Sequence, residues 1–419
     1  MFLEFSVENY RSIAERQVLS FVAGKHRSDA DGMPAVDHPG FSAGKVLTSA
    51  VIYGANASGK SNLLRALNLA TAYVAISAAP IRASVEPFRL DATWANKPTR
   101  VEMSFLKDGI RYQYGFALDK ERVHEEWFIA YPKKVAQVWF TRHIGEDGVD
   151  IKFGPHLKGE KSRLATMTRS DALFLSTAAQ FNHPQLSEIH QWLIHNVTAQ
   201  RSHGFGPLRT IQLLENGSKE GASTVNELMR GADLGIMGLK VHRHTKMPDV
   251  ASGTKMVVRT NKEDEIWEVL TEHRCLDGSS VMFDLLDDES EGTGRFFELI
   301  EPLAHTLAVG GLLAIDELDQ SLHPLLVRKI ISLFHDPTIN KKGAQLVFNT
   351  HDATLLDPKL FRRDQIWFME KDNASKTRLY SLLDYSPRKD EALQRGYLLG
   401  RYGGIPFLGG FHFPSKRSA

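Results

Sequence analysis

The pattern that most constrains this chain is a glycine-rich stretch between an apolar run and a helical repeat. Residues 54–61 read Gly-Ala-Asn-Ala-Ser-Gly-Lys-Ser, with two glycines separated by four residues and followed by Lys and Ser. Residues 46–53 before it are mostly apolar, as in a buried central strand. Residues 62–75 after it carry apolar side chains at helical spacing. A strand, a tight turn and a helix in this order predict a phosphate-binding loop, or P-loop.

Each position of this loop has a chemical reason. Gly54 and Gly59 let the backbone curl so that its N–H groups point at phosphate oxygens. Lys60 would reach the β- and γ-phosphates, and the Ser61 hydroxyl would hold Mg²⁺. The helix that follows directs its positive N-terminus at the same anion. The other candidates for nucleotide contact in this segment are Asn56, Ser58 and Asn62. The sequence therefore predicts ATP and Mg²⁺ as cofactors.

A second apolar run ends in two adjacent acids. Residues 311–315 are Gly-Leu-Leu-Ala-Ile, and Asp316 and Glu317 follow. Asp316 would orient Mg²⁺ through its water shell, and Glu317 would polarise the water that attacks the γ-phosphate in line. Two acids at the end of a strand are often ordinary surface residues. Paired with a P-loop, they predict ATP hydrolysis, with Lys60 and Glu317 as catalytic residues.

The two ends of the chain alternate between short strands and helices, and the middle differs from both. A meander is expected before residue 154, with strands over Val101–Leu106, Tyr112–Leu118 and Trp127–Ala130. Helical signals dominate the segment after it. We therefore predict an α/β P-loop NTPase in three parts: residues 1–154 as the first part of the ATPase core, 155–280 as an inserted helical lobe, and 281–419 as the second part of the core.

Composition excludes several classes of protein. Lys and Arg total 51 against 50 for Asp and Glu, which argues against a global attraction to nucleic acid but leaves a local basic patch open. Cys275 is the only cysteine, so an internal disulfide is excluded, as fits a reducing cytosol. The start carries Glu4 and no basic segment, and the longest apolar stretch, Leu307–Ile315, is too short to span a bilayer. We expect a cytoplasmic protein without a signal peptide or a membrane segment.

Three further motifs follow in a fixed order. They are Ser290-Glu-Gly292-Thr before an apolar helix, residues 318–324 (Leu-Asp-Gln-Ser-Leu-His-Pro) after the acid pair, and Thr350-His351-Asp352 after an apolar run. Each alone is weak, because a lone Ser-x-Gly or a lone His is common. Together they resemble the signature, D-loop and His switch of the ABC-type ATPase superfamily, in the branch that includes recombination, SMC-like and OLD-like proteins. The resemblance implies an ABC-ATPase-like head.

The resemblance also implies roles for these residues. Ser290 and Gly292 would contact the γ-phosphate held by the P-loop of the other subunit, so a homodimer with composite ATP sites is implied. His351 would sense the γ-phosphate as a third catalytic residue, and Asp319 would link the two sites. The signature departs from the common Leu-Ser-Gly-Gly form, because Glu291 occupies its second slot, directly after Ser290.

A further ligand of Mg²⁺ in this superfamily, the Q-loop glutamine, is harder to place. Gln180 stands where the meander gives way to the helical segment, which is where that loop belongs, and it is the favoured candidate. Gln113, inside a predicted strand, is the competitor. An ordinary amide is the remaining interpretation of Gln180.

A narrower resemblance covers essentially the whole chain. Residues 5–12 (Phe-Ser-Val-Glu-Asn-Tyr-Arg-Ser), the Ser290 signature and residues 400–406 (Gly-Arg-Tyr-Gly-Gly-Ile-Pro) are together similar to bacterial AAA-type ATP-binding proteins of the RloA/AbiL kind. Those proteins are associated with phage defence and abortive infection, which implies a regulatory ATPase acting with a separate effector protein. OLD-type relatives carry a nuclease domain after the ATPase. No acid-rich nuclease motif follows His351, so a nuclease-like activity is expected in the partner.

Other functions remain open. A DNA-repair or DNA-end-binding ATPase of the RecF and SMC kind would act directly on nucleic acid. Its support is a set of basic residues in the middle segment, although a solvated face is the ordinary explanation: Lys152, Lys158, Lys161, Arg163, His242–Lys246, Lys255, Arg259 and Lys262. A nucleotide sensor that hardly hydrolyses ATP is disfavoured by the intact P-loop lysine and acid pair. A zinc site among the 17 histidines is disfavoured because no cysteine accompanies them.

Overall fold

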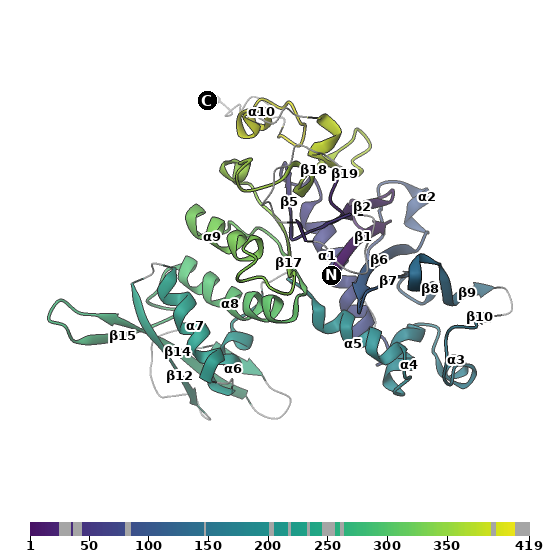
Figure 1. The fold of residues 1–419 in the computed structure, drawn as a ribbon, viewed down its shortest axis with the longest axis horizontal. Helices are drawn as coiled ribbons and strands as arrows, with labels where there is room; N and C mark the ends of the chain where they lie inside the picture. The colour runs from purple at the N-terminus through teal and green to yellow at the C-terminus, as the bar shows by residue number, and fades with distance from the viewer. Residues whose placement is uncertain are drawn as a thin grey trace, which may run out of the picture.

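The computed structural model describes residues 1–24, 35–36, 44–79, 85–145, 148–200, 205–216, 219–232, 235–244, 256–259, 264–386 and 391–406. In Figure 1 a six-stranded sheet lies at the centre, a seven-stranded antiparallel sheet lies on one side of it, and a lobe with a four-stranded sheet lies on the other. Two short strands, β3 (Ala35–Val36) and β4 (Val46–Leu47), pair separately.

The central sheet is built from both ends of the chain. In spatial order its strands are β11 (Val197–Ala199), β16 (Leu312–Ile315), β17 (Gln345–Asn349), β5 (Ser49–Gly54), β18 (Ile366–Lys371) and β19 (Thr377–Ser381). The first five are parallel, and β19 is antiparallel to β18. Every residue of β5, β16 and β17 is buried, as expected of parallel strands covered on both faces. The loops that follow the parallel strands therefore meet at one edge of the sheet.

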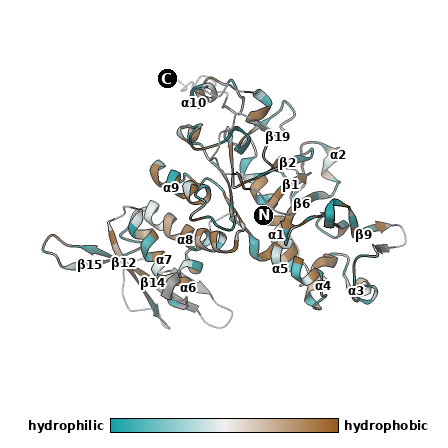
Figure 2. Ribbon diagram, viewed as in Figure 1, coloured by the Kyte–Doolittle hydropathy of each residue, from teal (hydrophilic) through white to brown (hydrophobic). Residues whose placement is uncertain are grey.

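Helices cover both faces of the central sheet. Successive residues of β5 point to opposite faces: Ala50 and Ile52 join the hydrophobic cluster of α1 (Lys60–Ile76), whereas Val51 and Tyr53 join that of α8 (Glu291–Val309) and α9 (Pro324–His335). Figure 2 shows hydrophobic colouring along these helices. The predicted strands and helices that flank the P-loop and the acid pair are confirmed.

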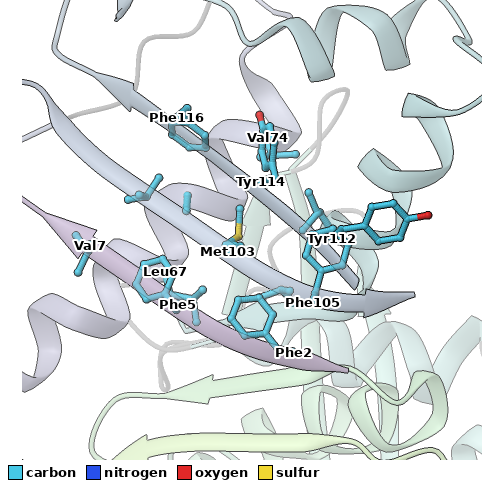
Figure 3. Close-up of a cluster of buried hydrophobic side chains, with 14 of the residues drawn as sticks. Phe2, Phe5, Val7, Leu67, Val74, Met103, Phe105, Tyr112, Tyr114 and Phe116 are labelled. Atoms are coloured by element: carbon cyan, nitrogen blue, oxygen red, sulfur yellow. The ribbon is translucent and has the colours of Figure 1, made fainter. Parts of the chain in front are cut away.

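The predicted meander is confirmed and is longer than expected. Its spatial order is β10 (Gly148–Phe153), β9 (Gln137–Gly145), β8 (Val123–Tyr131), β7 (Ile110–Leu118), β6 (Thr99–Lys107), β1 (Phe2–Glu8) and β2 (Gln17–Ser20). Residues of β6 alternate between buried and half-buried, which gives the sheet one apolar face. Figure 3 shows that face, where Phe5, Met103 and Phe116 lie over Leu67 and Val74 of α1.

A buried ion pair fixes the meander to the helices α3 (Ser162–Met167), α4 (Phe174–Gln180) and α5 (Leu186–Asn196). Glu126 on β8 accepts hydrogen bonds from the N–H groups of Phe174 and Leu175 at 2.7 and 3.0 Å. Arg142 on β9 lies 3.7 Å from the same carboxylate, and neither side chain is exposed. Burial raises the pKa of Glu126, and the Arg142 charge opposes that shift. The start of α4 is therefore set by the sheet.

The expectation of a helical lobe over 155–280 is wrong in part. Helices α3 to α5 lead into β11, which is a strand of the central sheet. The segment after β11 contains two helices and a four-stranded antiparallel sheet: α6 (Leu208–Asn216), α7 (Lys219–Gly231), β12 (Ile236–His244), β13 (Met256–Arg259), β14 (Asp264–Arg274) and β15 (Ser280–Asp284). The reason is a period of two in β14, where Trp267, Val269 and Thr271 are buried and the residues between them are not.

Two short helices, α2 (Ala92–Ala95) and α10 (Leu393–Leu398), complete the helices of the fold. Within the described residues, none of the helices has the length and apolar character needed to cross a bilayer. Three members of the predicted basic set of the middle segment, Lys246, Lys255 and Lys262, lie outside the described residues.

Candidate ATP-binding and hydrolysis site

The P-loop joins β5 to α1 and needs glycine at both ends of its pattern. Gly59 has φ of 109°, in the left-handed region, and a Cβ there would lie 2.3 Å from Thr377 Oγ1. A Cβ on Gly54 would lie 2.3 Å from the carbonyl oxygen of Met369. Any larger residue would therefore displace β18 or β19, which pack against the loop.

Polar groups from distant segments hold the loop in this shape. Ser12 belongs to the opening motif and Thr377 begins β19, and their hydroxyl oxygens lie 2.8 Å apart. Thr377 Oγ1 also lies 2.9 Å from the carbonyl oxygen of Ser58, inside the loop. Asn62 donates a 2.8 Å hydrogen bond to Ser12 Oγ, so its amide braces the loop. Thr377 could not be selected from the sequence, because its role depends on the pairing of β19 with β18.

Lys60 lies buried among the groups predicted to hold phosphate and metal. Its Nζ donates to the carbonyl oxygens of Gly54 and Ala55 at 2.7 and 3.1 Å. Burial lowers the pKa of Lys60, and the charges of Glu317, Asp316 and Asp319 oppose that shift, so the acids of the second motif lie near this ammonium.

The loop surroundings fit a bound triphosphate. The Ser58 hydroxyl is buried and has no hydrogen-bond partner among the described residues. Asn56 is exposed at the loop tip, and Ser61 is half-buried at the start of α1. A buried cation, an unpartnered hydroxyl and a helix N-terminus together suit an anion with a metal counter-ion.

Asn349, at the end of β17, holds both acids of the second motif. Its Nδ2 donates to Asp316 Oδ1 at 2.5 Å, and its Oδ1 accepts from the Glu317 N–H at 2.7 Å. Asn349 is fully buried. Glu317 has φ of 52°, a left-handed conformation that costs a non-glycine residue about 1–2 kcal/mol. The hydrogen bond from the Glu317 N–H supports this backbone conformation, and the hydrogen bond to Asp316 Oδ1 fixes the Asp316 carboxylate.

The D-loop and the His switch touch each other within one chain. The backbone N–H of His351 donates to Asp319 Oδ2 at 3.2 Å. The other carboxylate oxygen, Asp319 Oδ1, is buried and unpartnered in the described part of the chain. The His351 side chain is exposed at the end of β17, one strand from the P-loop strand. The predicted link from Asp319 to a second site is not tested by these contacts and stays a prediction.

The structure does not bring Gln180 to this site. Gln180 is exposed at the end of α4, and α4 packs on the far end of α1, where Ser176 Oγ donates to the Val74 carbonyl at 2.7 Å. Val74 lies about 21 Å from Lys60 at the helical rise of about 1.5 Å per residue. The competitor Gln113 is also excluded, because it lies in the meander and donates to Glu102.

Gln200 takes the place expected for that glutamine. It follows β11, the neighbour of the acid-bearing strand β16. Its Oε1 accepts from the Asp316 N–H at 3.0 Å and from Arg295 Nη2 on α8 at 3.2 Å. The available sequence signal was the short run Val197–Ala199 before it, which is only three residues long. Gln200, rather than Gln180, thus borders the acid pair.

The signature residues lie at the N-terminus of α8. Ser290 caps this helix, and its Oγ accepts from the Thr293 N–H at 3.1 Å. A Cβ on Gly292 would lie 2.4 Å from the Ser321 carbonyl oxygen, so the D-loop packs directly on the first turn. Both residues border a hollow of about 520 Å³ together with Ser321, His323 and Lys329. A helix N-terminus that opens into a hollow favours a negatively charged group.

The P-loop follows the central strand β5, the acid pair follows β16, and His351 follows β17, which lies between those two strands. This arrangement defines a P-loop ATPase of the AAA and ABC-like class. The chain belongs to the family described as "AAA domain, putative AbiEii toxin, Type IV TA system", which matches residues 49–192 and 256–357. Those two ranges contain the P-loop, the signature, the acid pair and His351.

Similarity to solved structures adds little to this assignment. The SMC head domain from Thermotoga maritima matches with 12% sequence identity and a TM-score of 0.39, covering 91% of this chain and 98% of that chain. No curated protein matches the chain. The fold class follows from the strand order and from the position of the P-loop in it.

Proposed function

We propose that this chain is an ATP-hydrolysing switch that works as a head-to-head homodimer with two shared sites. The observation that carries the proposal is that the predicted site residues lie in two separate places on the chain. Groups suited to phosphate, metal and water meet at the strand-end edge, whereas Ser290 and Gly292 open into a hollow whose described lining includes no P-loop residue. A second copy that places its P-loop over this hollow would complete both sites.

Each group at the strand-end edge has a role in this reaction. The P-loop N–H groups and Lys60 would hold the β- and γ-phosphates, and Ser61, Asp316 and Gln200 would hold Mg²⁺. The metal would supply positive charge to the developing charge on the γ-phosphate. Glu317 would orient the attacking water.

The remaining groups shape the site around the reacting atoms. Asn349 would keep both acids in place through the two hydrogen bonds described above. His351 would face the γ-phosphate from the next strand. From the other subunit, Ser290 and the α8 N-terminus would complete the phosphate contacts, which ties hydrolysis to dimer closure.

We further propose that the ATPase is the regulatory component of a bacterial phage-defence system of the RloA/AbiL kind, acting with a separate effector. The whole-chain sequence resemblance supports this role, and so does the family description, which names a putative AbiEii toxin and a Type IV TA system. The lobe of α6, α7 and the four-stranded sheet is the part of the chain that the ATPase chemistry does not use. It is therefore the proposed site of coupling to the effector.

Complementation between two inactive variants tests the shared site. Ser290→Arg should bind ATP normally but fail to dimerise and hydrolyse, because a bulky cation fills the space meant for the partner's γ-phosphate. Mixed with Lys60→Ala, it should recover partial ATPase activity, since one site of the heterodimer then combines an intact P-loop with an intact signature. Light scattering in the Glu317→Gln background should show an ATP-dependent dimer. No recovery, together with a species that stays monomeric under saturating ATP and Mg²⁺, would remove the shared-site proposal.

Addition of double-stranded DNA ends to the wild-type protein tests the rival function. The switch hypothesis expects the same turnover with and without DNA. A DNA-dependent rise in turnover that falls steeply with salt would favour a DNA-end-binding ATPase instead.

A further inference from the structure

The segment that joins the four-stranded sheet to the signature is short and braced. Strand β15 ends at Asp284, and only residues 285–289 separate it from Ser290. The Asp284 N–H donates to Asp288 Oδ2 at 2.8 Å, and the Asp284 carboxylate accepts from the Leu286 N–H at 2.8 Å. Leu285 is buried, and its N–H donates to the Val269 carbonyl of β14 at 2.9 Å. This turn therefore moves with the sheet rather than acting as a loose linker.

A side-chain clasp ties the same sheet to the residue just before the signature serine. The Glu289 carboxylate accepts from His273 Nε2 at 2.6 Å and from the Thr271 hydroxyl, and both donors lie on β14. Glu289 is 9% exposed and His273 is 20% exposed, so solvent screens the contact only weakly. The His273 ring also packs against Phe283 of β15, with ring centroids 4.9 Å apart. We call Thr271, His273 and Glu289 the clasp.

Helix α8 carries this connection into the core. Its buried residues Phe296, Phe297 and Ile300 pack in the cluster that covers the central sheet. Arg295, on the second turn, contacts Gln200 Oε1 at 3.2 Å and the Asp316 carbonyl at 3.5 Å. The N-terminus of α8 is thus held on one side by the lobe sheet and on the other by the residues that border the metal site. A shift of β14 relative to the core would move Ser290 first.

We propose that His273 and Glu289 are positioning residues for Ser290, through which the four-stranded sheet controls hydrolysis at the partner subunit's P-loop. The inference rests on the proposed shared site, because Ser290 acts there on the phosphate of the other chain. It makes the lobe sheet the input of the switch: a partner that displaces the sheet changes the position of the signature. The clasp connects the lobe sheet to the signature.

A purely stabilising role for the clasp makes a different prediction. If the three residues only hold the lobe together, their loss lowers thermal stability and weakens every function of the variant chain. If they position Ser290, their loss spares ATP binding to the variant's own P-loop and damages only the site to which that chain contributes its signature.

The test compares His273→Ala and Glu289→Ala with two matched variants. His273→Gln keeps a donor of similar reach toward Glu289, and His242→Ala removes an exposed histidine from β12 of the same sheet. The two clasp deletions should lower kcat about tenfold with little change in ATP affinity. His273→Gln should restore most of the rate, and His242→Ala should match the wild type. An equal mixture of His273→Ala with Lys60→Ala should exceed the sum of the separate activities, because one site then has an intact P-loop and an intact clasp.

Two results would overturn the inference. One is a wild-type kcat in both His273→Ala and Glu289→Ala, after thermal melts have shown that both variants are folded. The other concerns the two mixtures. The ATPase activity of His273→Ala mixed with Lys60→Ala would only equal the sum of the separate activities, while Ser290→Arg mixed with Lys60→Ala recovers activity. Failure of that second mixture as well would instead count against the shared site itself, so the two proposals fail separately.

Discussion

At the strand-end edge Lys60, Asp316 and Glu317 are each held by groups of their own chain, whereas at the signature Ser290 and Gly292 face an open hollow. The first region is preorganised, to the point that Asn349 keeps Glu317 in a left-handed conformation. The second region offers a capped helix N-terminus beside a hollow whose described lining includes no residue of the P-loop. Electrostatic preorganisation is the largest single contribution in reactions of this kind, so the chain supplies most of the chemistry alone.

The contrast assigns different tasks to the two regions. The groups at the strand-end edge suit nucleotide binding. Under the proposed function this edge also places the attacking water, and the signature region responds to the partner subunit, with its position coupled to the lobe through the clasp. Single substitutions at the edge should therefore act on the chain that carries them, and substitutions at the signature should act on the partner. Substitutions at the edge should also differ from one another in the size of their effect.

The largest effect should come from Lys60→Ala. It removes the buried ammonium expected to contact the β- and γ-phosphates, so ATP affinity should fall by about 10²–10³-fold and turnover should be lost. Lys371→Ala, an exposed lysine on β18, is the matched control and should bind normally. Titration with a fluorescent ATP analogue gives both affinities. Wild-type affinity in Lys60→Ala would count against the entire site assignment.

Glu317→Gln should separate binding from hydrolysis. The amide keeps the size of the side chain but cannot accept a proton from water, so turnover should fall by about 10²–10⁴-fold while ATP binding persists. Single-turnover kinetics measures the chemical step directly. Normal hydrolysis in that assay would remove Glu317 from the reaction, and removal of Mg²⁺ with a chelator should slow the wild type to a comparable level.

Asn349→Ala should cost about 100-fold in kcat with a small change in KM, because the two acids lose the group that fixes their position. Asn349→Asp is the sharper variant. It retains an acceptor for the Glu317 N–H but sets a carboxylate against Asp316, so it should be no better than the alanine variant. Thermal melts show whether both proteins fold. Near-normal kcat in Asn349→Asp would show that the hydrogen bond to Asp316 is dispensable.

The sequence predicted the motifs that are contiguous. The P-loop, the acid pair and the serine cap of α8 are each readable from a few adjacent residues, since the strand or helix beside them has its own local pattern. The roles of Asn349 and Thr377 were not predicted, because they depend on which strands lie side by side. The four-stranded sheet of the lobe was not predicted, because its strands carry many charged residues and follow two helices. A single chain gives no direct signal for strand neighbours of that kind.

The Q-loop glutamine shows the same limit most clearly. Chain order pointed to Gln180, which stands at the change from meander to helices, but α4 packs at the wrong end of α1. The strand that leads to the site, β11, has three residues and pairs with β16 more than 100 residues later in the chain. The glutamine at the acid pair therefore comes one helix, α5, and one strand, β11, later in the chain than the predicted one.

The smallest effect expected at the edge provides the test of that correction. Gln200→Ala should reduce kcat about tenfold and raise the Mg²⁺ concentration needed for half-maximal rate, because its Oε1 borders Asp316 and Arg295. Gln180→Ala should leave both quantities unchanged, since its side chain is exposed at the end of α4, and α4 contacts α1 at Val74, about 21 Å along that helix from Lys60. The two substitutions remove the same amide, so they form a matched pair. A Mg²⁺ titration of the ATPase rate compares them directly. A loss confined to Gln180→Ala would reverse the assignment, and an equal loss in both would show that neither amide acts through the metal.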